Sequence, residues 1–231
     1  MRRSNLQLYM TGFGPFKSIT VNPSAMIGES VSKGMMEDSE LQVHYEKLEV
    51  GLEAVSAYFG GLEAAIAKNM EDNPDGCVLL VHLGLHSREE EGKMRLEVCG
   101  YNELEGSPID ESMPMDMCLH SKLVNEGCNE SKAIADLIEE LNAAISKRGR
   151  KEGDRQHPYW IISRDGGRYY CNYTLYRSLK LEKKWRGRVF AVFVHVANPF
   201  TCNNPSLEEQ TTQVRSLVSG LVRILRNKEI V

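Results

Sequence analysis

Two apolar runs place the strongest limit on what this 231-residue chain can fold into. Residues 78–83 begin with four consecutive apolar side chains, and residues 189–194 are apolar throughout. Uninterrupted runs of this length, rich in β-branched and aromatic residues, are typical of strands that are buried on both faces. Such strands occur at the centre of a parallel sheet that has helices on each side. The sequence therefore predicts that both runs lie in the middle of one sheet.

Amphipathic segments separate the predicted strands. Apolar residues recur at helical spacing in three segments, namely 54–70, 133–145 and 214–224. Asn22-Pro23-Ser24 is typical of a helix start. Further strands are expected at residues 6–10, 41–50, 94–102 and 159–162. Because strands and helices alternate, we predict an α/β protein: a single three-layer α/β/α domain spanning 1–231, with an open, mainly parallel twisted sheet.

Charge and hydropathy exclude several kinds of partner. The formal net charge of −4 gives no reason to expect nucleic acid or a membrane surface as a partner. The apolar run after Met1-Arg2-Arg3 is too short for a signal peptide or a membrane span, so we expect a cytoplasmic protein. Residues 147–157 are mostly charged and contain glycine, and we expect a mobile surface loop there rather than a nucleic-acid-binding arm.

The cysteines do not show the local spacing of a zinc site. None of the six forms a Cys-x-x-Cys pair, and no nearby histidine completes a metal-ligand pattern. His82 and His86 are four residues apart, but His82 lies in a predicted strand, where this spacing does not bring two imidazoles together. We therefore expect reduced thiols, no metal and no cofactor.

Residues 163–176 are the most informative stretch for function. A predicted strand ends just before this stretch, a glycine pair follows at 166–167, and aromatic residues at helical spacing come next. This order places Cys171 in or near the first turn of a helix, where unpaired backbone N–H groups favour a thiolate. A buried cysteine that acts only as a small hydrophobic residue is the alternative interpretation.

Three reactive residue types occur beside predicted strands: Glu97, Cys171 and His195. A cysteine peptidase needs such a set, because a thiolate attacks, an imidazole transfers the proton and a third group orients the imidazole. Placement in the chain does not prove that the three meet. A histidine or glutamate at a strand end is also common as a structural residue, so this alternative remains open on placement alone.

Four separated segments together resemble pyroglutamyl peptidase I, the cysteine peptidase family that removes N-terminal pyroglutamate. They are Thr11–Phe16 with Asn22-Pro23-Ser24, Leu96–Asn102, Ser163–Tyr176 and Phe193–Val196. The resemblance implies an exopeptidase with a triad of Cys171, His195 and Glu97 and a thioester intermediate. Its substrates would be pyroglutamyl peptides.

The same resemblance implies the residues that bind the substrate. Phe13 and Phe16 would line the pocket for the pyrrolidone ring, Asn22 would shape its polar side, and Tyr170 would also contact the substrate. A small neutral lactam suits a mostly apolar slot with a few backbone hydrogen-bond partners. The sequence leaves the oligomeric state open between a monomer and a homodimer.

The chain departs from the family pattern at a few positions. Ser107 falls where many members have an arginine near the oxyanion site, and Ala197 replaces a more usual proline. Because of the missing arginine, a non-catalytic binder of pyroglutamyl-capped peptides, which kept the pocket but lost the chemistry, is the alternative function. A phosphate-handling enzyme lacks support, because no glycine loop ending in Gly-Lys-Ser/Thr occurs.

Overall fold

The computed structural model describes residues 6–89, 92–123, 131–147, 160–200 and 205–227. Strands and helices alternate along most of this part of the chain. In order they are β1 (Leu6–Phe13), α1 (Pro23–Met35), β2 (Leu41–Leu48), α2 (Leu52–Asp72), β3 (Cys77–Leu85), β4 (Met94–Glu97), β5 (Cys99–Tyr101), β6 (Cys118–His120), α3 (Lys132–Lys147), β7 (Trp160–Ser163), α4 (Tyr170–Lys184), β8 (Val189–Val196) and α5 (Leu207–Arg226).

The main sheet has six strands in the order β2-β1-β3-β8-β4-β7. The first four strands in this order are parallel to one another. β4 runs antiparallel to β8, and β7 runs parallel to β4. β3 and β8, which contain the two apolar runs, are adjacent at the centre. The prediction of an open, mainly parallel sheet is confirmed, and its reversed end is a feature that the sequence pattern did not indicate.

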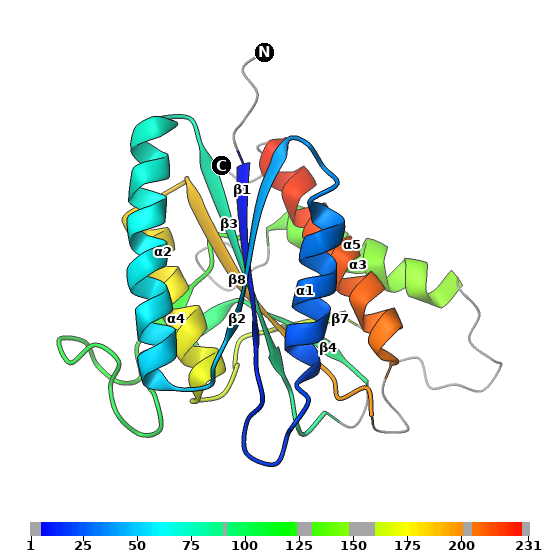
Figure 1. The fold of residues 1–231 in the computed structure, drawn as a ribbon, viewed down its shortest axis with the longest axis horizontal. Coiled ribbons are helices and arrows are strands. Elements are labelled where there is room, and N and C mark those ends of the chain that lie inside the picture. The colour runs from blue at the N-terminus through cyan, green and yellow to red at the C-terminus, as the bar shows by residue number, and fades with distance from the viewer. Residues whose placement is uncertain (1–5, 90–91, 124–130, 148–159, 201–204, 228–231) are drawn as a thin grey trace.

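Helices cover both faces of this sheet, as Figure 1 shows with the sheet seen nearly edge-on. α2 and α4 lie on one face, and α1, α3 and α5 lie on the other. Alternate residues of each central strand point to opposite faces, so each face has its own apolar core. Leu80 and Ala191 face α2 and α4, whereas Leu79 and Val192 face the other three helices. The predicted three-layer α/β/α architecture is confirmed.

The segment 94–102 differs from the prediction, because it forms two strands rather than one. β4 belongs to the main sheet, whereas β5 pairs with β6 in a separate two-stranded sheet. Val98 separates them: its N–H donates to Ser163 O at 3.0 Å, and its carbonyl accepts from Ser121 N at 2.8 Å. The chain therefore changes hydrogen-bonding partners at this residue, which ends one strand and starts the next.

Two further predictions concern the segment 147–157 and the lack of a membrane span. Within the segment 147–157, only Lys147, the last residue of α3, is described. The expected mobile loop thus lies outside the described residues. Among the helices of the described part, none combines the length and the apolar character needed to cross a bilayer.

Candidate active site

His195 and Glu97 form a buried pair at the junction of β8 and β4. In the antiparallel register Glu97 lies opposite Phe193, so Glu97 and His195 are diagonal neighbours on the same face of the sheet. The distance from His195 Nδ1 to Glu97 Oε1 is 2.8 Å, and the two side chains are 5% and 0% exposed. The carboxylate therefore fixes the orientation of the imidazole.

Cys171 reaches the same place from α4. β7 ends at Ser163, and the chain then turns through Gly167, whose φ of +82° favours glycine. This turn places Cys171 over the end of β3, where a Cβ atom added to Gly84 would lie 2.8 Å from the sulfur. Gly84 is the register partner of His195 on the adjacent strand. The three residues proposed from the sequence are thus brought together.

The groups around His195 raise the pKa of its imidazole. Burial lowers the pKa of the imidazole, but a negative charge on Cys171 and hydrogen bonds to Cys171 and Glu97 outweigh this and raise it to about 9. Glu97 Oε2 is buried and accepts no hydrogen bond from the described residues, so His195 is the partner that compensates the carboxylate. A pKa of about 9 favours the positively charged imidazole at neutral pH.

The first turn of α4 has unpaired donors. Its N-cap residue, Tyr169, makes no side-chain capping hydrogen bond, and the first turn contains no acidic residue. In α1, by contrast, the Asn22 side chain accepts from Ser24 N. The N–H groups around Cys171 are therefore available to an anion at the positive end of the helix dipole.

Side-chain hydrogen bonds fix α4 to its surroundings. Asn172 accepts from Tyr101 N at 2.8 Å and donates to Tyr101 O at 2.9 Å and Glu103 O at 2.7 Å. One turn and a half further on, Ser178 Oγ lies 2.8 Å from His82 Nε2. The other ring nitrogen of His82 lies 2.8 Å from Thr11 Oγ1, so this buried histidine links β1, β3 and α4. Burial lowers its pKa to about 3, and the ring is neutral.

Other residues around Glu97 and His195 were not found from the sequence. The ring of His86 packs edge-on against His195 with centroids 5.6 Å apart, and Phe193 packs against it at 4.9 Å. Burial and then the positive charge of His195 lower the pKa of His86. A Cβ atom on Gly166 would lie 3.7 Å from both Glu97 and His195, so this glycine covers the pair closely. These contacts depend on the folded register and have no local sequence signal.

The predicted substrate-binding residues lie at the end of β1, in the segment between β1 and α1, and at the start of α4. Phe13 is buried, with its ring centroid 6.5 Å from that of Phe193. Phe16 is half-buried, and Lys17 Nζ lies 4.9 Å from its ring and 5.9 Å from the ring of Tyr169. The loop after β1 therefore approaches the residue that precedes α4.

Asn22 and Tyr170 contribute to the framework of these loops. Asn22 Nδ2 donates to Gly14 O at 3.0 Å, and its Oδ1 accepts from Ser24, so its polar atoms hold the loop and cap α1. Tyr170 is the first residue of α4 and packs partly buried against the apolar core on this face. Neither observation tests a contact with substrate, and those roles stay predictions.

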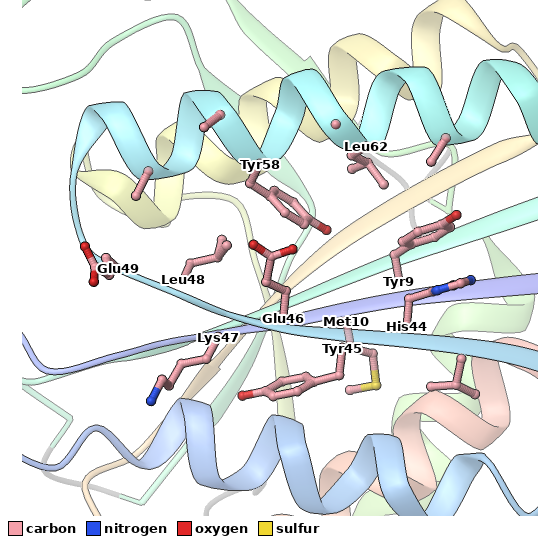
Figure 2. Close-up of a pocket in the computed structure, with 15 residues that line it drawn as sticks. Tyr9, Met10, His44, Tyr45, Glu46, Lys47, Leu48, Glu49, Tyr58 and Leu62 are labelled. Carbon is pink, nitrogen blue, oxygen red and sulfur yellow. The ribbon is translucent and has the colours of Figure 1, made fainter.

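A cavity of about 860 Å³ lies at the edge of the sheet formed by β2 (Figure 2). It follows β2, with Tyr58 and Glu46 on the side of α2 and Tyr45 on the side of α1. β1 and β3 separate this edge from β8, and none of the three proposed catalytic residues lines the cavity. Size alone does not identify the reactive centre.

Comparisons with known proteins extend over nearly the whole chain. No protein-family model matches the chain. Over 230 residues the chain is 26% identical to pyroglutamyl-peptidase 1 of Mus musculus and also of Homo sapiens, covering 99% of the chain and 96% of each relative.

Solved structures with the same fold include a mutant pyrrolidone carboxyl peptidase from Pyrococcus furiosus. Its TM-score is 0.67 at 20% identity, with 95% of this chain and 99% of that one covered. The pyrrolidone carboxyl peptidase of Fervidobacterium islandicum gives 0.65 at 21% identity, with 94% and 99% covered. Over nearly its whole length, the chain is similar in sequence to pyroglutamyl peptidase I and in fold to the pyrrolidone carboxyl peptidases.

Proposed function

We propose that the chain is a cysteine exopeptidase that hydrolyses the bond after an N-terminal pyroglutamyl residue. The observation that carries the proposal is the position of His195, which interacts with Cys171 on one side and Glu97 on the other. Similarity to pyroglutamyl-peptidase 1 across 99% of the chain supports the choice of substrate. In this reaction Cys171 is the nucleophile, His195 the acid and base, and Glu97 the group that orients His195.

In the first half of the reaction the sulfur of Cys171 attacks the carbonyl carbon that joins pyroglutamate to the next residue. The carbonyl oxygen becomes an oxyanion, which the N–H groups of the first turn of α4 stabilise. One such donor contributes about 3 kcal/mol in related acyl transfers. The C–N bond then breaks, and the protonated His195 gives its proton to the leaving amine. A thioester and a shortened peptide result.

In the second half water hydrolyses the thioester. The neutral imidazole of His195 takes a proton from the attacking water, and Glu97 stabilises the positive charge that develops on the ring. The carbon–sulfur bond breaks, free pyroglutamate leaves, and the thiolate–imidazolium pair is restored. No redox step occurs, and the chain requires no cofactor for this chemistry.

The pocket for the pyrrolidone ring is proposed between the loop after β1 and the start of α4. Phe13 and Phe16 supply apolar walls, Tyr170 contacts the substrate, and Asn22 maintains the loop that shapes the polar side. A lactam has one N–H, one C=O and no charge, so backbone groups suffice to recognise it. The closeness of the two loops at Lys17 supports this location.

The proposed chemistry also bears on the partners and the location of the protein. Pyroglutamyl peptides are the proposed substrates, and nucleic acid and membranes are not proposed as partners. Cys77, Cys99, Cys118 and Cys171 carry thiols rather than disulfides, which supports a reducing, cytoplasmic location. Residues 1–231 are proposed to act as one catalytic domain.

The test is release of a fluorogenic amine from a pyroglutamyl amide. Activity in the parent chain, and its loss in Cys171→Ala, is the expected result. Cys77→Ala is the matched control, because Cys77 lies at the start of β3, at the end away from Gly84. Equal rates in the parent and Cys171→Ala would refute the nucleophile. If the parent binds a pyroglutamyl peptide without any turnover, the alternative of a non-catalytic binder is correct.

A further inference from the structure

A second group of reactive side chains lies on the small sheet formed by β5 and β6. In its antiparallel register Cys99 is opposite His120, and Tyr101 is opposite Cys118. Alternate residues of a strand share a face, so Cys99, Cys118 and His120 project from the same side. None of them belongs to the proposed catalytic triad.

The ligand atoms of these three residues converge. Both sulfurs and one ring nitrogen lie within 4.8 Å of one another, and Cys99 Sγ is 2.9 Å from His120 Nδ1. Around a tetrahedral zinc ion, a sulfur and a nitrogen are about 3.6 Å apart and two sulfurs about 3.8 Å apart, from the usual bond lengths. The contact between Cys99 and His120 must open by about 0.7 Å. His120 is exposed and can supply that movement by rotating its side chain.

We propose that Cys99, Cys118 and His120 bind a thiophilic divalent ion, Zn²⁺. Two thiolates and one imidazole form a donor set that zinc prefers, and a water molecule completes the tetrahedron. Each thiol loses its proton to solvent when its sulfur coordinates the ion, so two protons are released per ion bound from the thiol form. The two thiolate charges then neutralise the two charges of the cation.

The surroundings allow an ion to enter and remain. Cys99 is buried, Cys118 is half-buried and His120 is exposed, so the site opens to solvent from the His120 side. One cation, Arg168, lies close, with its guanidinium 3.8 Å from the ring of Tyr101. Asp165 at 2.6 Å and Glu103 at 3.2 Å pair with this guanidinium, so its charge is compensated locally.

The position of the site gives the ion a structural effect. β5 follows β4 after one residue, and Asn172 hydrogen-bonds the Tyr101 backbone to α4. A bound ion therefore stabilises β5, the strand to which Asn172 of α4 is hydrogen-bonded. Because the ion binds the folded chain preferentially, it raises the unfolding temperature. The site does not depend on the proposed peptidase function.

The primary test is titration of the reduced full-length chain with Co²⁺, followed by displacement with Zn²⁺. Tetrahedral thiolate coordination gives a sulfur-to-cobalt charge-transfer band and visible d–d bands. We expect one ion per chain, the same spectrum in Cys171→Ser, and at least about tenfold weaker binding in Cys118→Ser and in His120→Ala. These two positions are chosen because they are the more exposed ligands, and circular dichroism verifies that each variant is folded. Cys77→Ser is the matched thiol control and should bind normally.

Two results would overturn the proposal. Absence of the charge-transfer band in the reduced parent chain would show that the three side chains do not bind such an ion. Binding that survives in both Cys118→Ser and His120→Ala, or that disappears in Cys171→Ser, would place the ion elsewhere. A rise in unfolding temperature with Zn²⁺ in the parent, and no rise in folded Cys118→Ser, is the supporting result in a second measurement.

Discussion

Gly84 lies directly beneath the sulfur of Cys171. A Cβ atom at this position would be 2.8 Å from Sγ and 2.6 Å from Phe193 Cζ, closer than any real Cβ contact. Because Gly84 has no side chain, β3 leaves room at this position for the sulfur of the proposed nucleophile. Because Gly84 is also paired with His195 across the sheet, it sets how close the sulfur and the imidazole can be.

Gly84→Ala is therefore expected to reduce kcat/KM by about a hundredfold, since a displacement of about 1 Å can cost that much in a positioned reaction. Steady-state hydrolysis of a pyroglutamyl amide measures it. Gly61→Ala is the matched control, because a Cβ atom there meets nothing within 4 Å, and its activity should be normal. Full activity in Gly84→Ala would show that the sulfur does not need this space.

Glu97→Gln keeps the size of the side chain but removes its charge. The pKa of His195 then falls from its raised value of about 9, because the negative charge is lost and the amide oxygen accepts only a weaker, uncharged hydrogen bond. We expect kcat to drop by roughly a hundredfold or more, as in other triads that lose this carboxylate. The pH profile provides a second readout: the alkaline limb of kcat/KM should lie near pH 9 in the parent and at lower pH in the variant. An unchanged alkaline limb would contradict the pairing.

Protonation of His195 also links stability to pH. Its folded pKa of about 9 lies above the ordinary value of 6.5, so the folded chain holds a proton that the unfolded chain has lost. This contribution is fully present below pH 6.5, and it disappears as the pH rises through 9. The free energy of unfolding should therefore fall across this interval, but by less than about 1.4 kcal/mol per pH unit, because a thiolate at Cys171 offsets the proton that His195 gains. Denaturant unfolding at several pH values measures the slope.

Glu182 must be separated from this effect. Burial raises the pKa of its carboxyl to about 8, although hydrogen bonds from Lys122 N, Ala191 N and Ser121 Oγ oppose the rise. Its folded pKa is also above its unfolded value, so its contribution likewise decreases with rising pH, between about 4.5 and 8. In Glu182→Gln the slope between pH 8 and 9 should remain. A slope that vanishes there would assign the linkage to Glu182.

Asn172→Ala removes three hydrogen bonds between α4 and the chain around β5. We expect a loss of about 1–3 kcal/mol in the free energy of unfolding, since buried backbone partners are left unsatisfied, together with a lower kcat. Asn142→Ala is the matched control, because that side chain bridges to the backbone of Trp160 through two hydrogen bonds. If both variants lose stability but keep kcat, the anchoring of α4 is structural only.

The capping box of α5 offers a prediction about stability alone. Ser206 accepts from Glu209 N at 3.2 Å, and the Glu209 side chain accepts from Ser206 N at 2.8 Å. Ser206→Ala should lower the free energy of unfolding by about 1 kcal/mol, with unchanged kcat/KM. Thermal unfolding and the amide assay measure the two quantities, and reduced activity in the folded variant would contradict this separation.

Sequence patterns predicted the central strands and the helices, and they singled out the three residues of the proposed triad, because these depend on local periodicity and on motifs. They did not predict how the sheet is completed. Glu97 reaches His195 through an antiparallel strand, and only the pairing register places the two side chains on one face. The same holds for Cys99 and His120, which are distant in the sequence and opposite each other in the small sheet. Non-local pairing of this kind leaves no periodic signal in either segment.

His82 and His86 show that close spacing in the sequence need not bring two side chains into one site. Their spacing suggested a metal site only for a helix, and the structure places them in unrelated surroundings. His82 links Thr11 and Ser178, whereas His86 packs against His195. A histidine that ends up as a neutral structural link is indistinguishable, in the sequence, from one beside a reactive centre.

The reversed end of the sheet has a consequence for how the protein loses activity on heating. β4 and β7 contain four residues each, whereas β3 and β8 contain nine and eight. Glu97 lies on β4, and the turn that leads to Cys171 follows β7. These two short strands can unfold locally while the long strands stay folded. Heat inactivation should accordingly precede the loss of helical circular dichroism, and amide exchange should be faster in β4 and β7 than in β3.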